Sequence, residues 1–352
     1  MGPDCSRYSY NRVTMQTLLE KISCHHRLAK ALLLAASLSG VTHAQTVLRA
    51  SHQWPGGTGD VRDEMVQIIA REVDAADVDL SMRVYPGQSL LKAADQWSAV
   101  VRGQLDMTAL PLDYASGRHP QFNATLMPGL VKNHDHARRL NDSEFMDSIR
   151  QIIVDAGAIV LADAWLAGGF VSAKNCILAP DDIRGQVTRA AGPAFERMLA
   201  AAGASIASMP SSEIYTAMQT GVLDAANTSS ASFISYRIYE HTECLTAPGD
   251  YALWFMYEPV LFSKRRWDRL SAEQQAALLD AGQLAEDYFF EEAKQLDSSM
   301  EELFEQAGVE IVHMNSEQAD TWRQIAVATS YRVFADEVPG GALLIEQALA
   351  VE

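Results

Sequence analysis

Short apolar segments typical of β-strands alternate with helical segments through most of the 352-residue chain. In such an order the strands usually form largely parallel sheets, and the intervening helices cover their faces. A hydrophobic content of 48% over this length is enough for two lobes, each with its own core. We therefore expect an α/β fold. The expected early elements are the strands Val47–Ser51, Leu80–Val84, Leu105–Leu110 and Ile159–Ala162, and the helices Asp60–Ala75, Ala93–Val101 and His134–Ala156.

A helix of unusual length is predicted in the last third of the chain. Ser271 and Gln274 have the spacing of a capping box, which marks a helix start. From there to Ala307 the sequence contains no proline and a single glycine, Gly282. At roughly 1.5 Å per residue such a helix would extend about 50 Å, which is longer than one lobe requires.

The N-terminus has the pattern of an export signal. Arg27 and Lys30 precede an apolar run over Ala31–Val41, and Thr42-His43-Ala44 offers a small-residue cleavage site. The apolar run is too short to span a bilayer. We expect residues 1–44 to be a signal peptide, with Met15 as an alternative start of translation, and the mature protein to be periplasmic. The alternative is a buried N-terminal helix.

The cysteine count supports export. Cys5 and Cys24 would leave with the signal peptide, so that only Cys176 and Cys244 remain. An even pair in an oxidising compartment predicts a disulfide, and the alternative is two buried free thiols.

The formal net charge of −17 limits the partners of the protein. There is no basic stripe and no nucleic-acid motif, so nucleic acid is not expected as a partner. An acidic protein does not attract an anionic ligand through its overall field. A carboxylate ligand would therefore depend on local cationic and hydrogen-bonding groups.

Such groups gather in residues 183–233. Three strand-like pieces alternate there with helical pieces, over Gln186–Arg189, Ser205–Met209 and Leu223–Asn227. Arg189 ends the first strand, and strand ends in open α/β sheets are where ligands bind. Its planar guanidinium suits a carboxylate, although a surface ion pair would explain an isolated arginine equally well. Asn227, Thr228 and Ser229, which we expect to follow the third strand, could donate hydrogen bonds to an anion or cap the next helix.

The same stretch resembles one family closely. Ile183-Arg184-Gly185 and Thr188-Arg189 match a turn and a strand that ends in arginine, and a long ordered run follows them. The run consists of Met209, Pro210, Glu213, Tyr215, Ala217, Gln219, Gly221 and Asp224. This pattern is similar to that of the solute-binding proteins of TRAP (tripartite ATP-independent periplasmic) transporters, the DctP family. Weaker similarity extends from about Val47 to about Phe334.

The resemblance implies a type II-like periplasmic binding protein, with two lobes, a ligand cleft between them and a long helix that crosses both. We expect residues 45–166 with 257–299 to form the first lobe, and 167–256 with 300–352 to form the second. The implied function is to capture an organic acid and deliver it to the small and large membrane subunits of a TRAP transporter. The implied protein is a monomer without a cofactor and performs no chemistry.

The resemblance also indicates which residues contact the ligand. Arg189 would bind its carboxylate, and the polar groups of Asn227, Thr228 and Ser229 would orient it. Further contacts are expected from Trp54, Lys92, Tyr114, Phe170, Trp254 and Met256, most of which are aromatic or apolar and could equally be core residues.

Two departures from the family pattern restrict the ligand. Gly169 stands where sialic-acid binders carry a second arginine, which leaves one main anchor. This argues against sialic acid and favours a monocarboxylate with an apolar or aromatic body. Asn227 replaces a glutamate that helps to hold a metal in some relatives, so no metal is expected. C4-dicarboxylates, aromatic acids, sugar acids and hydroxy or keto acids remain open.

Catalytic patterns are weak. The chain has no G-x-S-x-G motif, and Gly57-Thr58-Gly59 lacks the third glycine of a dinucleotide-binding loop. Two alternatives to transport remain, a periplasmic enzyme on the same fold and a ligand-sensing partner of a membrane receptor.

Overall fold

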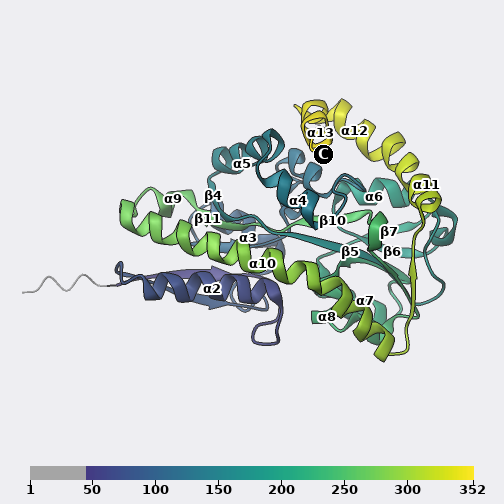
Figure 1. Ribbon diagram of the computed structural model, residues 1–352, viewed down its shortest axis with the longest axis horizontal. Helices are drawn as coiled ribbons and strands as arrows, with labels where there is room; N and C mark the ends of the chain where they lie inside the picture. The colour runs from purple at the N-terminus through teal and green to yellow at the C-terminus, as the bar shows by residue number, and fades with distance from the viewer. Residues whose placement is uncertain (1–44) are drawn as a thin grey trace, which may run out of the picture. The chain divides into compact units, whose positions relative to one another are not determined.

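The computed structural model describes residues 45–352, so the predicted signal peptide lies outside the described residues. Two mixed β-sheets form the framework (Figure 1). The first sheet has the strand order β2-β1-β3-β11-β4. Its strands are β1 (Thr46–Ser51), β2 (Leu80–Tyr85), β3 (Met107–Ala109), β4 (Ala158–Ala162) and β11 (Val260–Ser263).

The second sheet has the order β12-β9-β5-β8-β6-β7, and β10 pairs with β5. Its strands are β5 (Trp165–Ser172), β6 (Val187–Ala190), β7 (Ser205–Ser208), β8 (Ala225–Ser229), β9 (Cys244–Ala247), β10 (Trp254–Tyr257) and β12 (Glu310–His313). We call each sheet with the helices packed on it a lobe. The expected two-lobed α/β architecture is therefore confirmed.

Helices cover both sheets (Figure 1). On the first lobe α2, α3, α5 and α9 pack against the strands, and on the second lobe α6 and α8 do so. The helices are α2 (Val61–Ala75), α3 (Ala93–Val101), α4 (His134–Asn141), α5 (Glu144–Ala156), α6 (Gly192–Ala201), α7 (Ile214–Gln219), α8 (Ser230–Ser235), α9 (Lys264–Trp267), α10 (Ala272–Gln306), α11 (Ser316–Ala326), α12 (Arg332–Glu337) and α13 (Gly341–Leu349).

The expectation of largely parallel sheets is wrong. Strand β11 is antiparallel to both β3 and β4, and β5 is antiparallel to β8, β9 and β10. The reason is that two strand pairs carry the chain from one sheet to the other in opposite directions. β4 leads into β5 through Asp163-Ala164, and β10 returns to β11 through Glu258-Pro259.

These two crossing segments are bonded to each other. The backbone N–H of Glu258 donates to the carbonyl of Ala164 at 2.8 Å. The N–H of Asp163 donates to the carboxylate of Glu286 in α10 at 2.7 Å. The side chain of Asp163 also accepts from Arg150 and from Tyr257, which is fully buried. The connection between the lobes is therefore a hydrogen-bonded unit.

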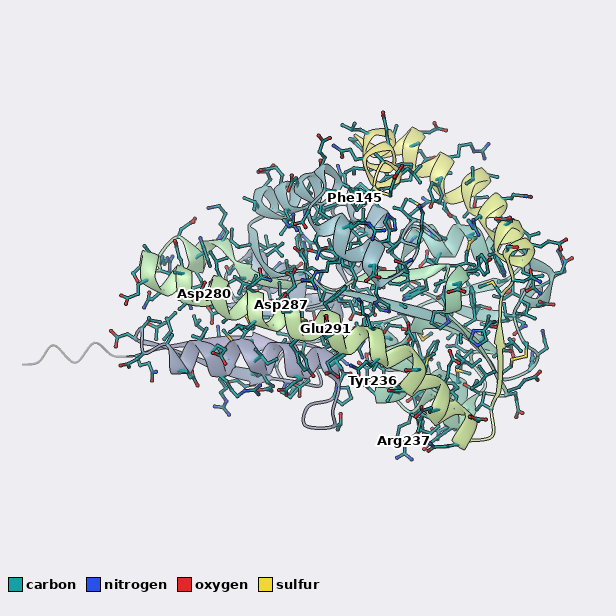
Figure 2. The ribbon with its side chains drawn as sticks, viewed as in Figure 1. Phe145, Tyr236, Arg237, Asp280, Asp287 and Glu291 are labelled. Carbon is teal, nitrogen blue, oxygen red and sulfur yellow. A yellow bond between two sulfur atoms is a disulfide. The ribbon has the colours of Figure 1, made fainter. Side chains whose placement is uncertain are left out.

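Helix α10 is the predicted long helix, and its 35 residues run unbroken through Gly282. The Ser271–Gln274 capping box is present at its start. It lies along α2 in the first lobe and reaches α8, β9 and β12 in the second (Figure 1). Its exposed side carries Asp280, Asp287 and Glu291 (Figure 2).

Two predicted boundaries need correction. The single helix expected over His134–Ala156 is two helices, because Ser143 caps α5 by accepting from the N–H of Met146. The third strand of the 183–233 segment also begins and ends two residues later than expected. Asn227, Thr228 and Ser229 therefore lie within β8 and do not follow it. Among the described residues, no helix is both long and apolar enough to cross a membrane.

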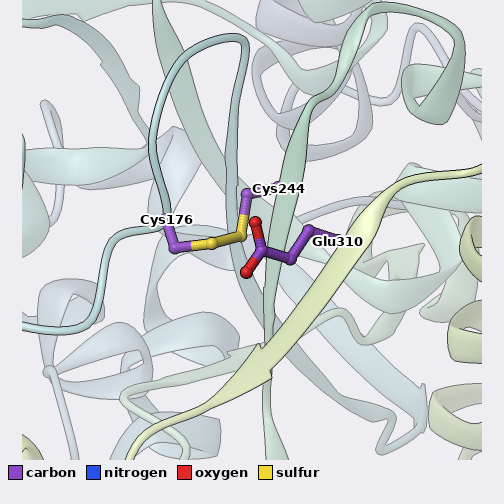
Figure 3. A group of neighbouring side chains, drawn as sticks. All are labelled: Cys176, Cys244 and Glu310. Carbon is purple, nitrogen blue, oxygen red and sulfur yellow. A yellow bond between two sulfur atoms is a disulfide. The ribbon is translucent and has the colours of Figure 1, made fainter.

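Cys176 and Cys244 form a disulfide, with Cα atoms 5.1 Å apart (Figure 3). The bond ties the segment after β5 to the start of β9. Glu310 of β12 lies beside the two sulfur atoms. Because each sulfur is bonded to the other, neither is available as the thiolate that a metal would require.

Gly282 is expected to be essential for the close packing of α10 against β4. A Cβ at this position would lie 2.0 Å from the carbonyl oxygen of Leu161, and backbone cannot give way as a flexible side chain could. Gly282→Ala should therefore lower the free energy of unfolding by about 1–3 kcal/mol despite its better helix propensity. Chemical denaturation measures the change. Gln283→Ala, on the exposed side of the same helix, should be nearly neutral, and equal stabilities of the two variants would contradict the close packing.

The disulfide should contribute substantially to stability. It closes a loop with a sequence separation of 68, for which the chain-entropy model gives about 4 kcal/mol. The variant with both cysteines changed to serine should unfold at correspondingly lower denaturant concentration. Mass spectrometry of the unfolded mature protein with and without reductant should differ by two hydrogens. No mass difference would show that the thiols are free.

Candidate ligand-binding site

The most constrained cation of the second lobe is Arg189 in β6. Its side chain is only 1% exposed. Nε donates to the carbonyl of Met209 at 3.0 Å, and one terminal nitrogen donates to the carbonyl of Asn227 at 2.7 Å. The other terminal nitrogen donates to the hydroxyl of Tyr114, in the first lobe, at 3.3 Å. Three bonds from three directions thus fix the plane of the guanidinium.

The hydrogen-bond count of Arg189 leaves a pair of donors. A guanidinium has five N–H groups, and three bonds are formed within the described part of the chain. The remaining two are one hydrogen on each terminal nitrogen. A carboxylate accepts from such a pair in a bidentate arrangement, which is among the strongest hydrogen-bonding geometries in proteins.

A cavity of about 410 Å³ lies between the lobes, and although Arg189 does not line it, two of the residues bonded to Arg189 do. Tyr114 and Met209, which both bond to Arg189, are part of its wall. This volume suits a small organic molecule. The first lobe contributes Ala94, Asp113, Tyr114, Ser116 and Gly117, and the second contributes Ala191, Gly192, Pro193, Glu196, Ser208, Met209 and Pro210.

A second fully buried arginine, Arg62, was missed in the sequence analysis. It sits at the start of α2, and Asp60 caps that helix by accepting from the N–H of Arg62. The side chain of Arg62 forms a two-point ion pair with Asp60 and lies over the ring of Trp54, 4.6 Å from its centre. A signal was available, because Arg62 precedes Val66 and Ile69 on the buried face of the helix.

Arg62 joins the two lobes. One terminal nitrogen donates to Ser229 at 3.3 Å and to Ser232 at 2.9 Å, both in the second lobe. Four of its five N–H groups are therefore used within the described residues, and the carboxylate of Glu258 lies 3.7 Å away. Unlike Arg189, it has no pair of donors left for a ligand carboxylate. Its geometry is that of a latch that holds the lobes together.

Other bonds between the lobes accompany this latch. The hydroxyl of Tyr236 (labelled in Figure 2) donates to the carbonyl of Gln53 at 3.2 Å. The side chain of Gln88 donates to the hydroxyl of Ser212 at 3.2 Å. These contacts define a closed arrangement of the lobes.

Two buried carboxyl groups face the arginines without hydrogen-bond partners. Both oxygens of Asp113 and one oxygen of Glu258 accept no bond within the described residues, and each residue is 2% exposed. Burial raises the pKa of Asp113 to about 7 and the pKa of Glu258 to about 7, although Arg189 and Arg62, respectively, oppose the shift. Each group can therefore carry a proton near neutral pH.

The predicted contact residues fall into two groups around this cavity. Tyr114 lines it, and Asn227 touches Arg189 through its backbone. The side chain of Asn227 is fully buried, and neither its oxygen nor its nitrogen has a partner among the described residues. Ser229 is the cap of α8 and a partner of Arg62. Thr228 lies between them and points to the other face of β8.

The remaining predicted contacts are packed in the cores or exposed. Trp54 belongs to the core of the first lobe, whereas Phe170, Trp254 and Met256 share a core cluster in the second. Phe170 stacks on Trp322, and Trp254 packs against Phe195. Lys92 is exposed at the residue before α3.

Gly169 in β5 leaves no room for any side chain. A Cβ there would lie 2.1 Å from the carbonyl oxygen of Thr246. The close packing of β5 against β9 thus explains why this position carries no side chain.

Comparison with known proteins identifies the family. The family model described as bacterial extracellular solute-binding protein, family 7 (DctP), matches residues 66–337. The chain belongs to this family. A solute-binding protein of Albidiferax ferrireducens is 36% identical over 319 residues, which are 89% of this chain and 94% of the relative. The predicted family is therefore confirmed, and so is the predicted location outside the cytoplasm.

Solved structures agree on the fold. A TRAP periplasmic solute-binding protein from Rhodoferax ferrireducens with bound malonate has a TM-score of 0.83 at 36% identity and covers 86% of this chain and 96% of its own. A TRAP solute-binding protein from Sulfurospirillum deleyianum with bound succinate has a TM-score of 0.79 at 22% identity, with coverages of 88% and 100%. DctP7 of Bordetella pertussis, which binds pyroglutamic acid, has a TM-score of 0.78 at 20% identity, with coverages of 86% and 99%. The family thus consists of solute-binding proteins, and the two neighbours below 25% identity support the fold alone.

Loss of the latch should be costly. Arg62→Met would leave Asp60 buried and unpaired, so the free energy of unfolding should fall by about 3–5 kcal/mol. Urea denaturation provides the measurement. Arg71, in the same helix, forms an exposed ion pair with Glu64, and Arg71→Met should cost at most about 1 kcal/mol. Equal losses in the two variants would show that Arg62 does not hold the buried pair.

Proposed function

We propose that this protein captures a small organic acid between its lobes and delivers it to the membrane subunits of a TRAP transporter. The observation that carries the proposal is Arg189, a buried guanidinium with one N–H left on each terminal nitrogen, two of whose partners belong to the wall of a cavity between the lobes. The ligand carboxylate would accept from this pair of donors. Tyr114 and the side chain of Asn227 would provide further polar contacts.

The cavity volume supports a small acid. The 36%-identical structure with bound malonate, from Rhodoferax ferrireducens, supports the same class. The geometry also supports capture without chemistry. Arg189 is held rigid by two backbone carbonyls, and the carboxyl groups nearby are buried beside arginines. Contact of the acid with both lobes would favour the closed state, which is the form that we expect to dock on the transporter.

A thermal-shift screen of the mature protein against organic acids, sugars and amino acids tests the proposal. An acid at about 100 times its dissociation constant should stabilise by roughly 2.7 kcal/mol, which gives a clear rise in melting temperature. Shifts with uncharged sugars only, or with no compound, would contradict it. Incubation with the acid that binds should leave that acid unchanged.

Substitution of Arg189 tests the anchor. Arg189→Ala should weaken the binding of the acid at least about 30-fold, because a buried charged partner is removed. Arg189→Lys keeps the charge but loses the planar fork, so it should also bind more weakly than the wild type. Isothermal titration calorimetry measures both.

The matched control is Arg184→Ala, which removes an exposed arginine paired with exposed Asp181 on the same segment. It should leave affinity unchanged. Denaturation curves establish that each variant is folded. Wild-type affinity in folded Arg189→Ala and Arg189→Lys would remove Arg189 from the site.

A further inference from the structure

The cleft contains more buried carboxyl groups than buried arginines. Arg62 and Arg189 face three buried carboxyl groups, those of Asp60, Asp113 and Glu258. Asp60 forms a two-point ion pair with Arg62, which holds its pKa below the usual range against the opposing effect of burial. If Asp113 and Glu258 were also ionised, the cluster would be negative before any ligand entered. A carboxylate ligand would then add a further negative charge to a site shielded from water, where like charges repel strongly.

Of these three buried carboxyl groups, Asp113 is the one that lines the cavity. Glu258, in contrast, lies 3.7 Å from Arg62, on the latch. Neither oxygen of Asp113 has a hydrogen-bond partner among the described residues, so the group is not committed to holding the fold together. A Cβ at Gly192 would lie 2.6 Å from one of these oxygens, which shows how closely the second lobe approaches the carboxyl group.

We propose that Asp113 binds the ligand as a neutral acid, donating its proton in a hydrogen bond to the ligand carboxylate that Arg189 holds. Binding of one carboxylate would then take up one proton from solvent. This inference rests on the proposed function. It assigns a ligand-binding role to a residue that carries the same charge as the ligand.

The surroundings of Asp113 favour this role. The charged groups that face it are Arg189 from β6, Glu196 from α6 and Glu258 from the crossing segment. The only titratable group beside it on its own turn is Tyr114. Burial and Glu196 favour the protonated form, whereas the backbone N–H groups of Asp113 and Tyr114 and, above all, Arg189 favour the ionised form. When the ligand carboxylate pairs with Arg189, that opposing influence is neutralised, so the proton on Asp113 becomes more stable. Protonation and binding therefore reinforce each other.

The test is calorimetric titration of the mature protein with malonate, succinate and pyroglutamate, in buffers of different ionisation enthalpy. The dependence of the heat on the buffer gives the number of protons taken up. Above neutral pH we expect uptake to approach one proton per ligand. The dissociation constant should then rise about tenfold per pH unit, because the free protein loses the proton that the complex requires.

Asp113→Asn separates the roles of the residue, because the amide has the shape of the protonated acid and also donates. This variant should bind at least as tightly as the wild type at pH 8, with no proton uptake and little dependence of affinity on pH. A loss of binding would show that Asp113 acts as an ionised acceptor, for example to a hydroxyl or N–H of the ligand, and would overturn the proposal.

Two matched variants locate the proton. Glu196→Gln changes another carboxyl group in the wall of the same cavity and should leave uptake intact. Glu258→Gln should also leave it intact, and abolition of uptake by this change instead would overturn the assignment to Asp113. Binding of an acid to the wild type without uptake would overturn the inference alone. Failure of every acid to bind at any pH would overturn the proposed function with it.

Discussion

The site depends on a buried cation that is held by backbone. Arg189 donates to the carbonyls of Met209 and Asn227, which belong to the segments after β7 and within β8. Carbonyls satisfy a guanidinium without neutralising its charge, so the cation remains available to an anion that enters later. The N–H groups that remain on its two terminal nitrogens are held in place before a ligand binds, which reduces the entropy cost of binding. An acidic protein can therefore hold a carboxylate in one place although its overall field does not attract one.

The connection between the lobes complements this arrangement. The two crossing segments bond to each other through Glu258 and Ala164, and Asp163 bonds to Glu286 of α10. The crossing segments and α10 thus form one bonded region between the lobes. Glu258 belongs to this region and also lies 3.7 Å from Arg62. Glu258 therefore connects Arg62, the latch residue, with the segments that cross between the lobes.

Much of the fold could be predicted from the sequence, because periodicity and capping are local. The capping box at Ser271 predicted the start of α10, and the cysteine count predicted the disulfide. The parallel sheets were predicted wrongly, because chain order does not reveal the strands that cross between lobes. The site was only partly predictable. Arg189 followed from a motif at a strand end, whereas Arg62 and Asp113 gain their significance from partners far away in the chain, such as Ser229 and Arg189.

A binding protein that delivers its ligand must also release it. The ligand should therefore supply only part of the free energy that favours the closed state. The bonds of Arg62 to Ser229 and Ser232, and of Tyr236 to Gln53, join the lobes without any ligand. They supply part of the free energy of closure, so the acid needs to provide only the remainder. That remainder is the free-energy difference between the closed cleft with a carboxylate beside Arg189 and the closed cleft without one. With Asp113 protonated, this difference includes a hydrogen bond from its carboxyl group as well as the bonds from Arg189.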